Sequence, residues 1–340
     1  MTMAPPRTLA AFIDQTGGRA ACLALSRDPN AKVTILLFPP GAARPAYVAK
    51  VPTTDAAALS VEREAERLAE VGDRVAGPVS ATIPELVATV EHLGRPVLVM
   101  TALPGQSMLA AYHSWRHTAR REAVAADFAA AGDWLARLHS AADGNGAADG
   151  NGQASVARML DGIADVLGRR FGGQPGADAD LAELAALRGR LEGHRTPQSV
   201  VHGDFWAGNL LTERGRVLGV IDWEHACLTG SPVRDLARFA TSYSLYLDRH
   251  TRQGRRVAGH PGLRAGRWGG GVDYAIDGSG WYPDLVRSFV MSGLERLGVS
   301  PSCWRDVLLA DLATVAATAD HDEFARNHLL LFRRLTEGQS

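Results

Sequence analysis

The sequence contains very little lysine. Only Lys32 and Lys50 occur among 36 basic residues, and all the others are arginine. A P-loop requires Gly-Lys-Ser/Thr, but both lysines follow an alanine, so this phosphate-binding loop is excluded. The Ser-x-x-Lys motif is also excluded, because Pro29 and Tyr47 occupy the serine positions. A lysine retained in such an arginine-rich sequence either marks a place that favours a compact ammonium group or is there by chance.

Cysteine and long apolar runs are also scarce. The three cysteines, Cys22, Cys227 and Cys303, are odd in number and far apart, which excludes a disulfide scaffold and disfavours a zinc site. Residues 1–15 lack the basic region and apolar core of a signal peptide. The apolar run at 33–38 has the length of a strand rather than of a bilayer span. We therefore expect a cytoplasmic protein with no membrane partner.

Neither charge sign is in excess. The chain has 36 basic and 37 acidic side chains in 340 residues, a balance that argues against a nucleic-acid partner. With 46% apolar residues it can form a sizeable core, and roughly 150 residues per domain predicts about two domains. We expect a monomer or a homodimer.

The first hundred residues alternate short apolar segments with turn sequences. This pattern predicts a small antiparallel sheet with strands near 20–25, 32–38, 46–51, 82–90 and 96–100. A helix follows the third strand, with Thr54 or Asp55 as its N-cap and Gly72 just past its end.

Beyond Ser107 the apolar spacing is mostly helical. It predicts helices near 120–139, 155–169, 179–191, 233–247, 282–297, 304–317 and 323–335. Residues 200–222 are the strand-like exception, with a turn at 213–216. Two segments read as irregular: residues 141–152, which repeat AADGNG and predict a flexible loop, and residues 254–280, which contain nine glycines and predict an extended insertion.

The residues best suited to chemistry lie between Val200 and Glu224. Asp204 and Asn209 share a polar loop between apolar segments, and Asp222 ends the strand that returns beside it. Asn209 and Asp222 offer the hard oxygen ligands that suit Mg²⁺, and Asp204 can accept a proton from a hydroxyl. Each of these residues alone could equally close a turn or cap a strand. Together they predict a phosphoryl-transfer site.

This segment resembles the catalytic and metal-binding loops of the aminoglycoside phosphotransferase family. It matches the family's His-Gly-Asp, four residues, Asn and Ile-Asp-Trp-Glu pattern at 202–209 and 221–224. Residues 231–237 and the Leu138-His139 pair are similar to further family motifs. The resemblance implies an α+β, bilobal protein-kinase-like fold. We expect a β-rich nucleotide-binding lobe at 1–103 with one key helix, and a larger, mainly helical lobe at 104–340 with an insertion at about 249–281.

The resemblance also implies an ammonium in the small lobe that holds the nucleotide phosphates, and Lys50 is in the expected place. The sequence itself indicates its partner. Glu64 is the only charge on a helical stripe otherwise formed by Ala57, Val61, Leu68 and Val71. A carboxylate that faces a core is costly unless it is paired, so we expect a Lys50–Glu64 ion pair. The alternative places Glu64 at the wet edge of the stripe. Lys32 is expected at the surface.

The remaining nucleotide contacts follow from the resemblance. The phosphate-covering loop is expected at Ser26–Asn30, although that segment has no glycine; residues 16–19 have glycines but lie farther upstream. The inter-lobe hinge corresponds to Met100, Thr101 and Leu103, whose backbone would pair with the base. His202 is expected to orient the catalytic loop rather than to act as an acid or base, and His139 to be a core histidine with satisfied hydrogen bonds.

The acceptor is left open by these motifs. Residues 249–267 carry six arginines and no acid, and read either as a solvated loop of biased composition or as a lid that contacts an anionic acceptor. A polycationic acceptor favours acidic residues, for which only Asp320, Asp322 and Glu323 are candidates. We therefore expect a kinase that uses ATP or GTP with Mg²⁺ and phosphorylates a hydroxyl of a small molecule, with an anionic acceptor included. The alternative is a catalytically silent, kinase-like nucleotide-binding module.

Overall fold

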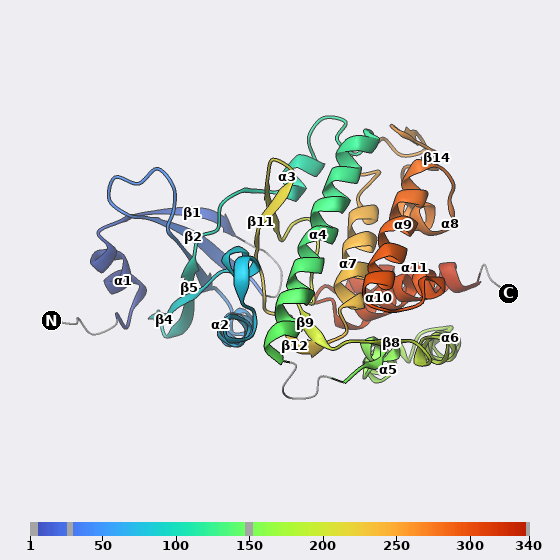
Figure 1. The fold of residues 1–340 in the computed structure, drawn as a ribbon, viewed down its shortest axis with the longest axis horizontal. Helices are drawn as coiled ribbons and strands as arrows, with labels where there is room; N and C mark the ends of the chain where they lie inside the picture. The colour runs from blue at the N-terminus through green and yellow to red at the C-terminus, as the bar shows by residue number, and fades with distance from the viewer. Residues whose placement is uncertain (1–5, 26–29, 147–151, 338–340) are drawn as a thin grey trace.

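A computed structural model describes residues 6–25, 30–146 and 152–337, and it has two parts (Figure 1). A five-stranded sheet with helices α1 and α2 forms one part, and a larger, mainly helical part carries the rest of the chain. No helix in the described ranges is long and apolar enough to cross a membrane. The α+β, bilobal architecture expected from the sequence is present.

The small sheet is antiparallel throughout, with the strand order β1-β2-β3-β5-β4. Its register places Thr34 of β2 and Leu98 of β5 on either side of Lys50 in β3. Each predicted strand is present within a few residues, as β1 (Arg19–Leu25), β2 (Lys32–Phe38), β3 (Tyr47–Pro52), β4 (Leu86–His92) and β5 (Arg95–Thr101).

Helix α2 (Asp55–Arg74) lies along this sheet and begins as the sequence predicts, because the side chain of Thr54 accepts a hydrogen bond from Ala57 N. Its predicted end is wrong, since the helix continues through Gly72 to Arg74. A glycine ends a helix readily only where the chain turns left-handed, and the backbone here keeps its helical course. The sequence also gave no indication of α1 (Leu9–Thr16), which packs Leu9 and Phe12 against the sheet.

The helical part contains most of the predicted helices with shifts of only a few residues. Its helices are α3 (Met108–Tyr112), α4 (Arg121–Gly146), α5 (Ile163–Phe171), α6 (Ala177–Glu192), α7 (Val233–Leu245), α8 (Gly270–Asp277), α9 (Trp281–Arg296), α10 (Trp304–Thr318) and α11 (Asp322–Glu337). The single helix predicted at 155–169 is wrong. A 3₁₀ helix at Val156–Leu160 precedes α5, and Gly162 interrupts them with a positive φ of 73°.

Short strands carry the loop singled out by the sequence. Strand β9 (Ser199–Val201) pairs with β12 (Cys227–Gly230), and β10 (Leu210–Glu213) pairs with both β11 (Arg216–Val220) and β6 (Gln106–Ser107). The β10–β11 turn lies where it was predicted, with positive φ at Arg214 and Gly215.

Both segments read as irregular are more ordered than predicted. Helix α4 extends through residues 141–146 of the AADGNG repeat, and residues 147–151 lie outside the described residues. The glycine-rich insertion folds into a hairpin, β13 (Arg256–Val257) and β14 (His260–Arg264), followed by α8. Packing explains α8, because Gly271 lies so close to the backbone of Ser244 that a Cβ atom would meet the Ser244 oxygen at 2.1 Å.

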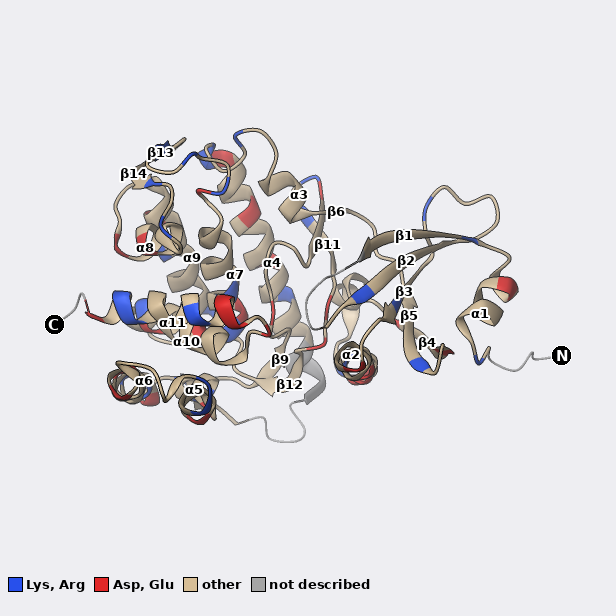
Figure 2. Cartoon of the chain, turned by 180° about the vertical axis from the view of Figure 1, so that it is seen from behind, with Lys and Arg blue, Asp and Glu red and all other residues tan. Residues whose placement is uncertain are grey.

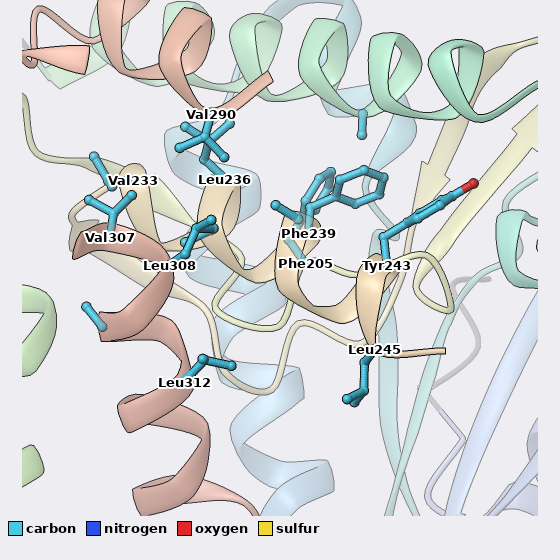
Figure 3. Packing of buried hydrophobic residues seen from close by; sticks show 14 of the residues in the cluster. Phe205, Val233, Leu236, Phe239, Tyr243, Leu245, Val290, Val307, Leu308 and Leu312 are labelled. Atoms are coloured by element: carbon cyan, nitrogen blue, oxygen red, sulfur yellow. The ribbon is translucent and has the colours of Figure 1, made fainter. Parts of the chain in front are cut away.

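Aromatic packing anchors the loop after β9 to the helical part. The Phe205 ring stacks on Trp134 of α4 with centroids 5.2 Å apart and lies 5.9 Å from Phe239 of α7. Figure 3 shows Phe205 and Phe239 beside Tyr243, in the largest cluster of buried apolar residues. A loop fixed by such a large buried ring holds its neighbours in place, and Asp204 is the residue before it.

Candidate active site

His202 is a positioning residue of the loop between β9 and β10. Its Nε2–H donates to the Ile221 carbonyl at 2.9 Å, and its Nδ1 accepts from Asp204 N at 3.2 Å. Burial lowers the pKa of His202, against the opposing effect of nearby carboxylates. A neutral imidazole whose two nitrogens are both engaged by the backbone holds the loop in place.

A buried carboxylate on α7 holds the same loop from the other side. Asp235 accepts hydrogen bonds from His202 N at 2.7 Å and Gly203 N at 2.8 Å. Gly203 itself is required, because its φ is 85° and a Cβ atom would meet the His225 carbonyl oxygen at 2.1 Å. The sequence showed Asp235 only as part of a helix-start motif. Its fully buried position in the first turn of α7 gives it the role of fixing the loop backbone.

Asp204 forms an ion pair that the sequence did not suggest. Its Oδ1 lies 2.9 Å from Arg238 Nε, and both side chains are largely buried. Burial raises the pKa of Asp204, but its neighbours, the Arg238 guanidinium foremost, together outweigh burial and lower the net pKa. Asn209 Nδ2 donates to the Asp204 carbonyl at 3.0 Å. Asp204 is therefore ionised and held at a fixed place on the loop.

Three distant segments meet at Lys50. Its ammonium lies 2.6 Å from both carboxylate oxygens of Glu64 and also contacts Asp222. The expected Lys50–Glu64 pair is thus present, with Glu64 fully buried rather than at a wet edge. Burial opposes the charge of Lys50, but the two carboxylates outweigh it and raise its pKa; Lys50 in turn lowers the pKa of Asp222 against the effect of burial. The β-sheet, α2 and the loop after β11 are joined through one ammonium.

The expectation that Lys32 lies at the surface is wrong. Its ammonium lies 2.6 Å from Glu224 Oε2 and 2.7 Å from Ser60 Oγ, and its side chain is only 14% exposed. Ser60 also donates to Glu224. Both lysines of the chain therefore contact the loop after β11, Lys50 through Asp222 and Lys32 through Glu224. The Ile-Asp-Trp-Glu sequence contained Glu224, but nothing local linked it to a residue so far away in the chain.

The candidate metal ligands flank the β10–β11 hairpin, Asn209 just before β10 and Asp222 just after β11. Ile221 N donates to the Asn209 carbonyl at 3.0 Å. Asp222 follows Ile221 directly in the chain, so this hydrogen bond brings the backbones of the two candidate ligands close together. Since the Asn209 amide nitrogen is engaged by Asp204, its amide oxygen is the group available to a cation. The Asp222 carboxylate is 41% exposed and ionised. This donor set fits Mg²⁺.

The expected nucleotide-binding residues are placed unevenly. Ser26 lies outside the described residues. The side-chain amide of Asn30, just before β2, donates to the Asp320 carboxylate at 2.5 Å and so contacts the helical part. The alternative glycines serve another purpose, because Gly17 is the C-cap of α1. At the hinge, Met100 is buried. The backbone N–H of Thr101 donates to the Glu85 carbonyl, so this N–H group is not free to pair with a base.

Leu103 packs against the hairpin: a Cβ atom on Gly219 would lie 2.8 Å from Leu103 Cβ. Leu103 also lines a pocket of about 700 Å³ with the β10–β11 turn. His139 is half-buried, and its hydrogen bonds are not satisfied as expected, since its enclosed Nε2 has no partner in the described part of the chain. Removal of the ring from water lowers its pKa to about 4. Asp322, a candidate for binding a cationic acceptor, is paired with Arg170 at 2.6 Å.

Comparison with known proteins gives one family and one fold. Residues 40–268 match the model of the phosphotransferase enzyme family. The homoserine kinase of Phenylobacterium zucineum is 30% identical over 146 residues, which span 42% of this chain and 40% of that protein. The chain thus matches less than half the length of this relative.

Solved structures resemble nearly the whole chain. A thermostable mutant of aminoglycoside phosphotransferase APH(4)-Ia superposes with a TM-score of 0.60 at 16% identity, covering 97% of this chain and 98% of that one. The GDP complex of aminoglycoside 2'-phosphotransferase-IIIa superposes with a TM-score of 0.51 at 15% identity, covering 95% of this chain and 93% of that one. Macrolide 2'-phosphotransferase MphH from Brachybacterium faecium superposes with a TM-score of 0.50 at 19% identity, covering 94% of this chain and 98% of that one. At such identities these likenesses establish the fold.

Proposed function

The chain belongs to the phosphotransferase enzyme family, and from this membership we propose that it transfers the γ-phosphate of ATP or GTP to a hydroxyl of a small molecule. The observation that carries the proposal is the convergence on Lys50 of Glu64 and Asp222, beside a loop that holds Asp204 ionised. Phosphoryl transfer requires positioning and charge stabilisation more than covalent chemistry, and this arrangement supplies both.

Lys50 is assigned to the α- and β-phosphates of the nucleotide. Glu64 fixes the ammonium through both its oxygens, and Trp223 N donates to the same carboxylate at 3.3 Å. Asn209 and Asp222 would hold Mg²⁺, which supplies positive charge to offset the phosphate oxygens.

Asp204 is assigned to the acceptor hydroxyl. As the bond between the γ-phosphorus and its bridging oxygen breaks, the acceptor oxygen forms a new bond to phosphorus and its proton passes to Asp204. The lowered pKa of Asp204 makes it a weak base, so its main contribution is to orient the hydroxyl and to accept the proton late in the transfer. His202 and Asp235 act through the loop backbone and hold Asp204 in place.

The division of labour between the parts belongs to the same proposal. Residues 1–103 would bind the nucleotide, with the Ser26–Asn30 connection over the phosphates and the Leu103 backbone beside the base. Residues 104–340 would supply catalysis and bind the acceptor. The β1–β2 register supports this position for the connection, because it places the end of β1 opposite Val33, next to Lys32.

A two-stage measurement tests the proposal. Thermal-shift titration with ATP or GTP and Mg²⁺ measures nucleotide binding, and ADP or GDP release against a panel of hydroxylated metabolites and antibiotics measures transfer. We expect binding, release that depends on one class of acceptor, and a mass gain of one phosphate in that acceptor. Nucleotide binding with no release for any acceptor would support the catalytically silent module instead.

A further inference from the structure

A pocket of about 590 Å³ lies in the helical part, outside the loops described so far. Its walls are the end of α3 with the segment after it, the segment after α7, and the turn between β13 and β14. Its aromatic lining consists of Tyr112, Trp115 and Tyr246. We call it the aromatic pocket. Its volume is typical of sites that enclose a small organic molecule.

The elements of the aromatic pocket also contact the candidate active site. At its other end α3 meets the catalytic loop, where Leu109 N donates to the Ala207 carbonyl at 3.1 Å. Helix α7 carries Arg238, the partner of Asp204, and is followed directly by Tyr246. Burial raises the pKa of Tyr246, and the charges of Arg238 and Asp204 also act on this phenol. Helices α3 and α7 therefore link the aromatic pocket to the loop that carries Asp204.

The floor of the aromatic pocket is rigid and its rim is open. Tyr112 is buried, its hydroxyl donates to the Tyr243 carbonyl at 3.0 Å, and the two rings meet edge to face at 4.7 Å. Trp115 at the rim is 87% exposed. An indole left in solvent at the edge of a cavity offers a planar surface that a ligand can cover.

The charges around the aromatic pocket are of one sign. Arg116 lines it, and the Arg249 guanidinium lies 5.9 Å from the centroid of the Tyr246 ring. None of its lining residues, all within the described ranges, is acidic. Asp248 is close in sequence, but its carboxylate accepts a hydrogen bond from Gly266 N in the insertion.

Two histidines of the lining contact each other. His113 Nδ1 and His250 Nε2 lie 2.9 Å apart and share a hydrogen bond. The other ring nitrogen of His113, Nε2, is shielded from solvent and has no partner among the described residues. Burial and the charge of Arg249 lower the pKa of His113, so the ring is neutral near pH 7. His113 therefore adds no positive charge to the lining near pH 7, and the cations there are arginines.

We propose that the aromatic pocket binds the acceptor of the transfer reaction, and that this acceptor is a hydroxyl compound with a planar or apolar face and an anionic group such as a carboxylate. The inference rests on the proposed phosphotransferase function. Ring surfaces match the apolar face, and the guanidiniums of Arg116 and Arg249 match the anion. A polycation would be repelled by the same guanidiniums, which sets this chain apart from enzymes that bind cationic antibiotics.

Isothermal titration calorimetry with three probes tests the charge and the location together. 4-Nitrophenyl β-D-glucuronide and 4-nitrophenyl β-D-glucoside differ by one carboxylate, and kanamycin is the polycation. The proteins are the wild-type chain, the double variant Arg116→Gln/Arg249→Gln, and Arg255→Gln as a matched control, since Arg255 is an exposed insertion arginine outside the lining. Thermal melting checks that each variant folds.

We expect the glucuronide to bind about 5- to 20-fold more tightly than the glucoside, as about 1–2 kcal/mol of charge-assisted contact would give. The double variant should lose this preference, and Arg255→Gln should keep it. Tighter binding of kanamycin, equal binding of the two glycosides, or failure of both to bind would overturn the inference. Because calorimetry does not require transfer, a chain that phosphorylates some other acceptor while failing here would refute the pocket and leave the proposed function standing.

Discussion

The site around Lys50 and the aromatic pocket differ in how their charges are arranged. Around Lys50 each charged group is paired with a group of opposite charge. Lys50 is paired with Glu64 and Asp222, and these contacts join the β-sheet to the helical part. Asp204 is paired with Arg238. Around the aromatic pocket the cations are exposed at the rim, and the described lining contains no carboxylate to pair with them. Figure 2 shows basic residues, in blue, on the segments around β13 and β14.

This difference separates two tasks of a phosphotransferase. Charges paired in advance hold catalytic groups at fixed positions and need little rearrangement during the reaction. Charges left without a partner can select a ligand of opposite sign. We therefore expect substitutions near Lys50 to lower turnover and substitutions at the aromatic pocket to change the choice of acceptor.

Replacing Asp204 by Asn should have the largest effect. The amide cannot accept the hydroxyl proton, so kcat should fall by about 10²- to 10⁴-fold, as expected for the loss of a positioned proton acceptor. Nucleotide affinity, measured by thermal shift with ATP and Mg²⁺, should stay within about twofold, since Asp204 does not contact Lys50. Unchanged kcat in this variant would remove Asp204 from the mechanism.

Replacing Lys50 by Arg should lower kcat/KM by about 10- to 100-fold in a folded protein. The planar guanidinium cannot take the place of a compact ammonium between two carboxylates, and small displacements of a catalytic group have effects of this size. Steady-state kinetics measure kcat/KM, and a circular dichroism spectrum checks that the variant is folded. Normal kinetics would mean that Lys50 is not a phosphate contact.

Replacing Arg238 by Met should shift the pH dependence of the reaction. Arg238 lowers the pKa of Asp204 in the wild type; without it burial dominates, so the pKa rises and Asp204 becomes protonated at a higher pH. The acidic limb of the kcat/KM profile should therefore move to higher pH than in the wild type. An acidic limb that stays in place would show that Asp204 is not the group that titrates.

Replacing Lys32 by Met should affect stability more than a comparable surface change. The variant leaves the mostly buried Glu224 without its cation, at a cost of about 1–3 kcal/mol. Arg67→Met is the matched control, because its pair with Glu70 is about 40% exposed and should contribute less than about 1 kcal/mol. Differential scanning fluorimetry compares the two melting temperatures. Equal shifts would mean that the Lys32–Glu224 contact adds nothing beyond a surface pair.

The Lys50–Glu64 pair could be predicted from the sequence because its cause is local. A single carboxylate on an apolar helical stripe must be paired, and the chain has few ammonium groups to choose from. The Lys32–Glu224 pair could not, since its partners are far apart in the chain and neither lies in a periodic pattern. Asp204 was found through its motif, whereas its partner Arg238 lies on a helix that contains another arginine, and only the packing of α7 selects it.

The irregular segments were misread for a related reason. Glycine, asparagine and aspartate weaken a helix by amounts that packing can override, as in α8. Helix α4 likewise continues through these residue types at 141–146. The aromatic pocket could not be predicted from the sequence, because Tyr112 and Tyr246 come together only where α3 meets the end of α7.

The most direct test of the separation between the two regions is the division of effects between kcat and the acceptor KM. It compares the Arg116→Gln/Arg249→Gln variant with the wild type, using an acceptor identified by nucleoside diphosphate release. The account predicts that acceptor KM rises by about 5- to 20-fold while kcat stays within about twofold, since only binding loses an interaction. A fall in kcat with an unchanged acceptor KM would contradict it, and would place these arginines in the transfer step itself.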